Sequence, residues 1–181
     1  TRSMFFLRHT MNCPNAPRGT NTLGEVPYNN FYQVDELRDL AYRIVNKYAD
    51  HSPCPPFKLI VYWVHKHVKY VTDQQQFGVN DFWLFPEETL LTGMEDCDGL
   101  AFLTASLLEA YGYPTRVCMG YSPFGYHAWV EFFDGNESYI VESTMGKIYH
   151  ISDARKLHYV PEIYITPNGC ATPDSFQERT Y

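Results

Sequence analysis

The sequence predicts an α+β fold, with helices in the first part of the chain and an antiparallel sheet in the second. Up to Tyr111, apolar residues recur at the three- and four-residue spacing of helices that bury one face. Gly112 and Pro114 then interrupt the chain, and from Thr115 onward apolar residues alternate as they do in strands. The 181 residues are enough for one domain with a substantial core.

The first third of the chain is predicted to contain an arm and two helices. Residues 1–32 are rich in Asn, Pro, Gly and Thr and show no period, so we expect an irregular N-terminal arm followed by one domain over residues 33–181. Helices are expected from Asp35 to about residue 50 and from about Phe57 to Val71, separated by a proline-rich break.

The segment that follows leads to a cysteine. Residues 72–80 are predicted to form a polar loop, and Pro86 with Glu87 and Glu88 is typical of the first turn of a short helix. A longer helix is predicted to begin at or beside Cys97 and to end at Tyr111. Free N–H groups and the helix dipole favour a thiolate at a helix N-terminus, which is where a nucleophile is expected. The alternative is that Cys97 is a small buried core residue.

Strands are expected at about residues 116–121, 126–133, 137–143, 147–151 and 163–165. His127 lies on the second of these, and Asp134-Gly135 after it indicates a two-residue hairpin loop. Such a loop would place His127 directly opposite Glu142, with Cβ atoms about 5 Å apart on one face. A three-residue loop would put Glu142 on the other face, and a cross-strand ion pair without chemistry is the alternative.

Cys97, His127 and Glu142 together supply the parts of a thiol enzyme. A thiol needs a base to become a thiolate and an acid to protonate the leaving group, and one histidine held by a carboxylate does both. The backbone N–H of Cys97 at the helix start could also stabilise an oxyanion. The sequence therefore indicates nucleophilic catalysis by Cys97.

The net charge of −7 disfavours a nucleic-acid partner, which would be met by a Lys- and Arg-rich surface. No apolar run reaches 18 residues, so no membrane span is expected. The five cysteines form no C-x-x-C pair and no zinc spacing. Five reduced thiols in a cytoplasmic protein is the default expectation, although two disulfides plus one reactive thiol, or a leader removed ahead of Thr1, are also compatible with the sequence.

Several segments in combination resemble the transglutaminase-like superfamily, over about residues 57–145. The segments are Trp83 with Pro86–Leu90, as in microbial members, then Glu95–Ala101, Leu107–Val117, His127–Glu131, and Glu142 ahead of Ser143-Thr144. The resemblance implies a papain-like core in which the helix of the nucleophile packs on the antiparallel sheet. It also implies Cys97 as nucleophile, His127 as base and acid, and Glu142 as the orienting carboxylate, where the family usually has aspartate.

The resemblance further implies a second oxyanion donor upstream of the cysteine. Trp83 and Gln76 are the candidates, with packing and loop roles as the alternatives. Some relatives bind calcium through acids near the cysteine, which here are Glu95, Asp96 and Asp98. Capping of the helix by these acids is the alternative, so we expect no cofactor unless calcium binds there.

The function expected from these residues is hydrolysis of a peptide or other amide through a thioacyl-enzyme intermediate, as in a peptidase, isopeptidase or amidase. A transglutaminase, in which an amine rather than water resolves the thioester, is one alternative. A non-catalytic binding module on the same fold is another, which the glutamate in place of aspartate leaves open. The small size and the absence of partner β-domains favour hydrolysis.

Overall fold

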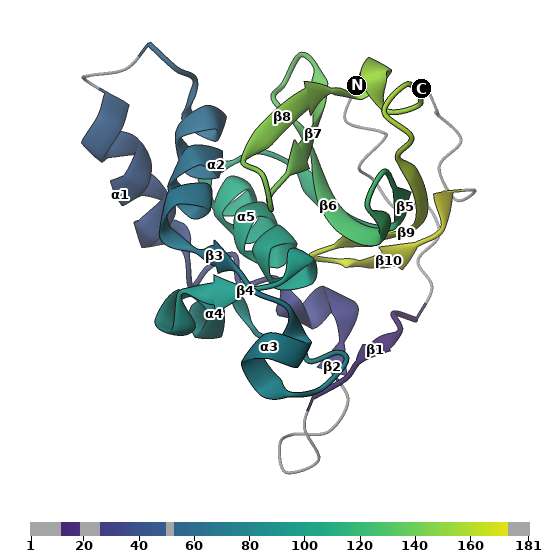
Figure 1. The fold of residues 1–181 in the computed structure, drawn as a ribbon. Coiled ribbons are helices and arrows are strands. Elements are labelled where there is room, and N and C mark those ends of the chain that lie inside the picture. Colours follow the sequence, from purple (N-terminus) through teal and green to yellow (C-terminus); the bar gives the residue numbers. More distant parts are fainter. Residues whose placement is uncertain (1–11, 19–25, 50–52, 174–181) are drawn as a thin grey trace.

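A buried helix lying against a curved antiparallel sheet forms the centre of the computed structural model, which describes residues 12–18, 26–49 and 53–173 (Figure 1). The helix is α5 (Cys97–Tyr111), and its leucines at 100, 103, 107 and 108 are at most 1% exposed. Helices α1 (Arg38–Ala49), α2 (Pro56–His67) and α4 (Pro86–Thr92) pack against α5, which contacts strand β6 of the sheet as well. The sequence prediction of an α+β fold with this helix on the sheet is confirmed.

The sheet has six strands in the order β10-β9-β5-β6-β7-β8, all antiparallel. The five expected strands are present, the last of them longer than expected, and a sixth was not predicted. Their bounds are Thr115–Ser122 (β5), Gly125–Phe133 (β6), Ser138–Glu142 (β7), Lys147–His150 (β8), Val160–Thr166 (β9) and Gly169–Ala171 (β10). A short 3-10 helix, η3 (Ile151–Asp153), follows β8.

The second helix ends earlier than expected, and the residues predicted to form its last turn are extended instead. Val68 is extended, and the two-residue strand β3 (Lys69–Tyr70) pairs in parallel with β4 (Met94–Glu95) just ahead of α5. The predicted polar loop after it contains a short helix, α3 (Asp73–Phe77). Thr72 and Gln75 form a capping box at its start, a local pattern that the sequence interpretation overlooked.

The hairpin between β6 and β7 is wider than expected, and the predicted register is wrong by two residues. Phe133 pairs with Ser138 and Val130 with Val141, so the loop has four residues rather than two. The Asp134 carboxylate accepts hydrogen bonds from the backbone N–H groups of Asn136 and Glu137, which closes the wider turn. Because the shift is an even number of residues, each side chain keeps its face of the sheet.

The described part of the N-terminal arm packs on this core. Strands β1 (Asn15–Ala16) and β2 (Val26–Pro27) pair with each other, and the 3-10 helix η2 (Tyr28–Phe31) follows. Ala16 and Phe31 are fully buried. Most of the remaining residues of the arm lie outside the described part, and the division into an arm and one domain stays a prediction.

A disulfide joins Cys13 of the arm to Cys170 of β10, with Cα atoms 5.2 Å apart. The expectation of five reduced thiols is therefore wrong. The pairing residues are separated by 157 positions, and such a contact is visible only in the folded chain. Cys54, Cys97 and Cys118 are not in disulfides. Among the described helices, none has the length and hydropathy needed to cross a bilayer.

Candidate active site

Cys97 occupies the first position of α5, as the sequence predicted. The parallel bridge between β3 and β4 pairs Tyr70 with Glu95, two residues before the cysteine, and so holds the start of the helix in place. The buried Glu95 side chain lies over Gly99, where any Cβ atom would overlap it. Glycine at position 99 is thus required for this close approach of the β4 side chain to the helix.

The His127 imidazole and the Glu142 carboxylate meet in spite of the shifted register. The pairing of β6 with β7 ends at Val130 and Val141, and the same register continued by one residue sets Glu142 opposite Trp129, which makes Glu142 a diagonal rather than a direct neighbour of His127. Long side chains still reach across a diagonal. Nε2 of His127 lies 2.9 Å from Oε1 and 2.8 Å from Oε2 of Glu142, and both residues are buried.

The same cavity receives both the thiol and the imidazole. It has a volume of about 400 Å³ and is lined by Cys97, His127, Thr144, Tyr70, Phe124 and Tyr126. Because Nε2 of His127 is directed at Glu142, Nδ1 is the ring nitrogen left to exchange a proton within this cavity. The structure therefore brings together the thiol, imidazole and carboxylate that the sequence indicated.

The carboxylate of Glu142 is held in its ionised form. Burial raises its pKa, but hydrogen bonds from His127, Thr144 and Tyr159 outweigh burial, so the pKa lies below its ordinary value. Thr144 donates through Oγ1 to Oε2 at 2.7 Å, and the Tyr159 hydroxyl donates to Oε1 at 2.8 Å. Because an ionised carboxylate can only accept a hydrogen bond, Nε2 of His127 is the ring nitrogen that carries the proton toward Glu142.

The Cys97 thiol is in an unfavourable setting for a thiolate when the protein is considered alone. Burial raises the pKa of the thiol, and the neighbouring Asp98 and Asp96 carboxylates raise it further. A backbone hydrogen bond from Ala128 lowers it in part. Loss of the thiol proton therefore depends on a proton acceptor in the cavity, on positive charge near the two aspartates, or on both.

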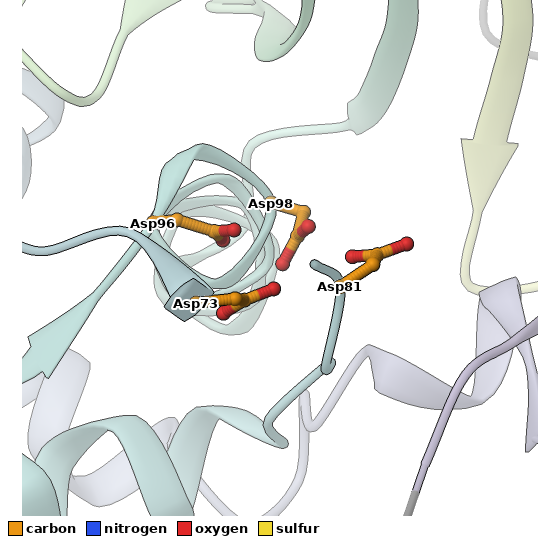
Figure 2. A group of neighbouring side chains, drawn as sticks. All are labelled: Asp73, Asp81, Asp96 and Asp98. Atoms are coloured by element: carbon orange, nitrogen blue, oxygen red, sulfur yellow. The ribbon is translucent and has the colours of Figure 1, made fainter. Parts of the chain in front are cut away.

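Four aspartates gather beside the start of α5, directed toward a shared space (Figure 2). One oxygen from each of Asp73, Asp81, Asp96 and Asp98 lies within 4.8 Å of the others. Asp73 and Asp98 are buried, whereas Asp81 is exposed. Asp73 comes from α3 and Asp81 from the segment after it, so residues of the predicted polar loop complete a group that Asp96 and Asp98 begin.

The electrostatics of this group fit a bound cation. In the described part of the chain, one buried oxygen each of Asp73, Asp96 and Asp98 has no hydrogen-bond partner. Burial raises the pKa of Asp73 to about 7 and also raises that of Asp98, with Asp96 adding to both. Oxygen-only donors of this kind are those that Ca²⁺ prefers.

The structure shows where each of the three predicted acids near Cys97 lies, whereas calcium binding stays a prediction. Asp96 occupies the N-cap position of α5, but its side chain makes no capping hydrogen bond, contrary to the capping alternative. Glu95 lies outside the group of four aspartates, and its Oε1 accepts the backbone N–H of Asp96 at 2.8 Å. A cation site in this structure would thus use Asp96 and Asp98 of the three predicted acids, with Asp73 and Asp81.

The two predicted oxyanion donors lie elsewhere. Neither Trp83 nor Gln76 lines the cavity of Cys97. The Trp83 indole N–H donates to Asp81 at 3.0 Å, and its ring stacks on Tyr28 with centroids 4.4 Å apart. Their oxyanion role stays a prediction, whereas the Tyr70 side chain does line the cavity.

Sequence reasoning missed Tyr70, Thr144 and Tyr159, and nothing local marks the two tyrosines. The sequence pattern predicts Tyr70 at the end of a helix, and the pairing with β4 that brings it toward Cys97 is a tertiary contact. Tyr159 comes from the turn before β9, 17 residues after the glutamate that it contacts. The Ser143-Thr144 dipeptide after Glu142 was the one available signal, and its hydroxyl role was not inferred.

Comparison with known proteins agrees with this architecture. The family model described as the transglutaminase-like superfamily matches residues 38–144. No curated protein matches the chain. Calcium-bound LapG of Legionella pneumophila superposes with a TM-score of 0.59 at 20% identity, over 82% of this chain and 92% of that one.

Two further solved structures show the same fold. EGTA-treated LapG of Legionella pneumophila has a TM-score of 0.56 at 20% identity, over 77% of this chain and 85% of the other. A proposed cysteine protease from Cytophaga hutchinsonii has a TM-score of 0.52 at 21% identity, over 67% of this chain. The match spans only 42% of the Cytophaga protein. At such identities these likenesses establish the fold alone.

Proposed function

The chain belongs to the transglutaminase-like superfamily, and from this premise we propose that it is a thiol-dependent hydrolase of peptide or other amide bonds. The observation that carries the proposal is the hydrogen-bonded pair of His127 and Glu142 at the cavity that also contains the Cys97 thiol. A non-catalytic module would have no need for a buried, ionised carboxylate fixed on an imidazole at that place.

In the proposed reaction, Nδ1 of His127 takes the proton of the Cys97 thiol, and Sγ attacks the carbonyl carbon of the amide. The tetrahedral intermediate collapses when the protonated imidazole gives its proton to the leaving nitrogen, which leaves a thioester on Cys97. Water, deprotonated by His127, then attacks the thioester and releases the carboxylic acid and the thiol. Glu142 keeps Nε2 protonated and holds the ring in one orientation throughout.

Two groups of this chain are proposed to stabilise the oxyanion. The backbone N–H of Cys97 at the start of α5 is one, and the Tyr70 hydroxyl is the other. Support for Tyr70 comes from its place in the lining of the cavity and from the raised pKa of its hydroxyl. Burial raises that pKa, and the neighbouring Cys97, Asp96 and Asp98 raise it further. A hydroxyl that keeps its proton can donate to a developing negative charge.

We propose that Asp73, Asp81, Asp96 and Asp98 hold calcium beside the nucleophile. When bound, the ion would offset the negative charge that now opposes a thiolate at Cys97. The unpartnered aspartate oxygens support this assignment, as does the calcium-bound form of LapG among proteins of similar fold. In this arrangement, carboxylates from α3, from the segment after it and from the start of α5 would bind one ion together.

The disulfide bears on where such an enzyme would work. Disulfides persist in oxidising compartments and are rare in the cytosol, with exceptions among hyperthermophiles. The Cys13–Cys170 bond therefore supports an oxidising compartment rather than the cytoplasm expected from five reduced thiols.

Alkylation tests the nucleophile without knowledge of the substrate. Sub-stoichiometric iodoacetamide, followed by peptide mass mapping, is expected to label Cys97 ahead of Cys54, although Cys54 is the more exposed thiol. His127→Ala should abolish the preference, because the activating base is then gone. Labelling of Cys54 first in the calcium-loaded wild type would contradict the proposal.

A second experiment separates hydrolysis from acyl transfer. A library of peptides is incubated with the enzyme, with and without a primary amine, and products are identified by mass. New carboxyl ends that require Cys97 support hydrolysis. Amine-linked products without hydrolysis would assign the chain to the transglutaminases, and no product from a library that includes glutamine peptides would favour the binding module.

A further inference from the structure

The Glu142 carboxylate accepts hydrogen bonds from two hydroxyl groups in addition to the His127 imidazole. Oε1 is shared by Nε2 of His127 and the Tyr159 hydroxyl, at 2.9 and 2.8 Å. Oε2 is shared by Nε2 and Oγ1 of Thr144, at 2.8 and 2.7 Å. Each oxygen is thus fixed from two directions, and the plane of the carboxylate cannot turn without breaking a hydrogen bond.

Tyr159 is anchored independently of the glutamate. Its backbone N–H donates to the carbonyl of Ala154 at 2.9 Å, at the end of a turn in which His158 takes the left-handed conformation with φ of 63°. Its ring meets Trp129 edge to face, with centroids 5.0 Å apart, and it is 6% exposed. The hydroxyl therefore reaches Glu142 from a rigid position on another part of the chain.

Thr144 is anchored in a different way. It belongs to the turn between β7 and β8, which is closed by a hydrogen bond from the backbone N–H of Met145 to the carbonyl of Glu142. The turn places Oγ1 of Thr144 within hydrogen-bond distance of Oε2 of Glu142. Thr144 also lines the cavity of Cys97 and His127. Both donors thus come from outside the His127 strand, one local to the glutamate and one remote.

We propose that Tyr159 and Thr144 are positioning residues, which hold the Glu142 carboxylate on Nε2 of His127 from its diagonal place in the sheet. This role rests on the proposed function. A glutamate has three rotatable side-chain bonds, and the register of β6 with β7 does not set Glu142 directly opposite His127. The two hydroxyl donors restrict these bonds, and in this way they keep the imidazole in the orientation that serves Cys97.

The same donors keep the carboxylate ionised. In the described part of the chain, the titratable groups around Glu142 are His127 from β6, Cys97 from α5, Tyr159 from the turn before β9 and Lys147, which is paired with Glu142 on β8; Tyr149 faces Tyr159 in turn. Of these, His127 and Tyr159 lower the pKa of Glu142 through hydrogen bonds, as the Thr144 hydroxyl does. Loss of either hydroxyl should raise the pKa of the carboxyl group and weaken its hold on Nε2–H.

The test uses Tyr159→Phe and Thr144→Val, each of which removes one hydroxyl. Tyr32→Phe is the matched control, because the Tyr32 hydroxyl is also buried and hydrogen-bonded, at 3.1 Å, but to Ile165 and Thr115. Thr144→Ser keeps the hydroxyl and serves as the rescue variant. We expect kcat to fall about tenfold in Tyr159→Phe and in Thr144→Val, with KM within about twofold of wild type. Thr144→Ser and Tyr32→Phe should retain the wild-type kcat.

Two further readouts separate positioning from general stability. The acid limb of the kcat profile should move to higher pH in Tyr159→Phe and Thr144→Val, and Tyr32→Phe should not move it. Nitrogen-15 NMR of the His127 ring, recorded in a Cys97→Ala background, should show one tautomer protonated at Nε2. In Tyr159→Phe and Thr144→Val the same spectrum should show a mixture of tautomers or exchange broadening.

The outcomes distinguish this inference from the proposed function. If wild type shows no thiol-dependent turnover, the proposed function fails, and the NMR spectra still decide whether the hydroxyls orient the imidazole. If turnover is present and Tyr159→Phe and Thr144→Val leave kcat, the acid limb and the tautomer unchanged, the positioning role is wrong. Should Tyr159→Phe fail to fold, the comparison of Thr144→Val with Thr144→Ser gives the answer.

Discussion

Glu142 lies diagonally across the sheet from His127, and the two side chains nevertheless meet at 2.8 and 2.9 Å. A side chain shorter by one methylene would start from the same backbone position and stop short of Nε2. The length of the glutamate is therefore matched to the four-residue hairpin loop that shifts the register.

This geometry predicts that aspartate is a poor substitute at position 142. In Glu142→Asp we expect kcat to fall by about a hundredfold, because the imidazole loses its orienting partner. Glu142→Gln keeps the length and one acceptor oxygen, so it separates the effect of length from that of charge. Steady-state kinetics with a substrate from the peptide library measure both variants. Wild-type kcat in Glu142→Asp would show that the diagonal contact is not needed.

The lowered pKa of Glu142 predicts a pH dependence of stability. Burial alone would raise this pKa, but the hydrogen bonds from His127, Thr144 and Tyr159 lower it overall. A carboxyl group whose pKa falls on folding stabilises the native state above its unfolded pKa, and the contribution disappears as the pH falls through the folded pKa.

Urea unfolding of wild type and Glu142→Gln should therefore differ most above about pH 5, and the difference should disappear as the pH falls through the lowered pKa of the folded protein. The exposed Glu36→Gln, measured in parallel, corrects for the change in net charge. A difference that grows toward acid pH would have the wrong sign and contradict the interpretation of the carboxylate contacts.

The aspartate group predicts stabilisation by calcium. Because a cation bound only to the native state adds RT ln(1 + [L]/Kd), calcium at a hundred times Kd should raise the unfolding free energy by about 2.7 kcal/mol. Thermal unfolding with added CaCl₂ or EGTA measures the effect. Magnesium should stabilise less, because it demands six ligands at shorter distances and gives up its water reluctantly.

Asp81→Asn is the most informative variant of this group, because Asp81 is exposed and its replacement should not disturb the core. Its calcium affinity should fall at least tenfold. Asp39→Asn, a change of equal charge at an exposed site on α1, should bind calcium as wild type does. An equal loss of calcium affinity in Asp81→Asn and Asp39→Asn would mean that calcium binds to surface charge in general.

The disulfide leads to two predictions, one for the number of thiols that can be titrated and one for the free energy of unfolding after its removal. Unreduced protein in denaturant should show three free thiols, and five after reduction. Since the bond closes a loop of more than 100 residues, replacing Cys13 and Cys170 by serine should lower the unfolding free energy by about 2–5 kcal/mol. Urea unfolding of that variant should no longer respond to dithiothreitol, whereas a count of five thiols without reduction would rule the bond out.

Helix α5 shows how far local pattern reaches. Leucines at helical spacing, a cysteine at the first position and Gly112 at the C-cap were sufficient to predict its start and end. The strands were predicted because alternation survives wherever one face of a sheet is buried. These signals are local in the chain, so they can be recognised without knowledge of the fold.

The hairpin illustrates where local pattern fails. Asp134-Gly135 favours a two-residue loop, but the Asp134 side chain accepts two backbone N–H groups and stabilises a wider one. The choice between the two loops depends on small differences in turn energy and on packing along the whole strand pair. The predicted direct pairing of His127 with Glu142 is therefore wrong, but both residues keep the predicted face, because the register shifts by two residues.

By itself, the sequence determined the α+β order of elements, the position of Cys97 at a helix start, and the identity of the histidine and carboxylate that share a face of the sheet. Only the tertiary structure decided the diagonal contact, the hydroxyls of Tyr159 and Thr144, the four aspartates and the Cys13–Cys170 bond. The physical reason is range: helical period and alternation act between near neighbours, whereas these contacts join residues from elements that only folding brings together.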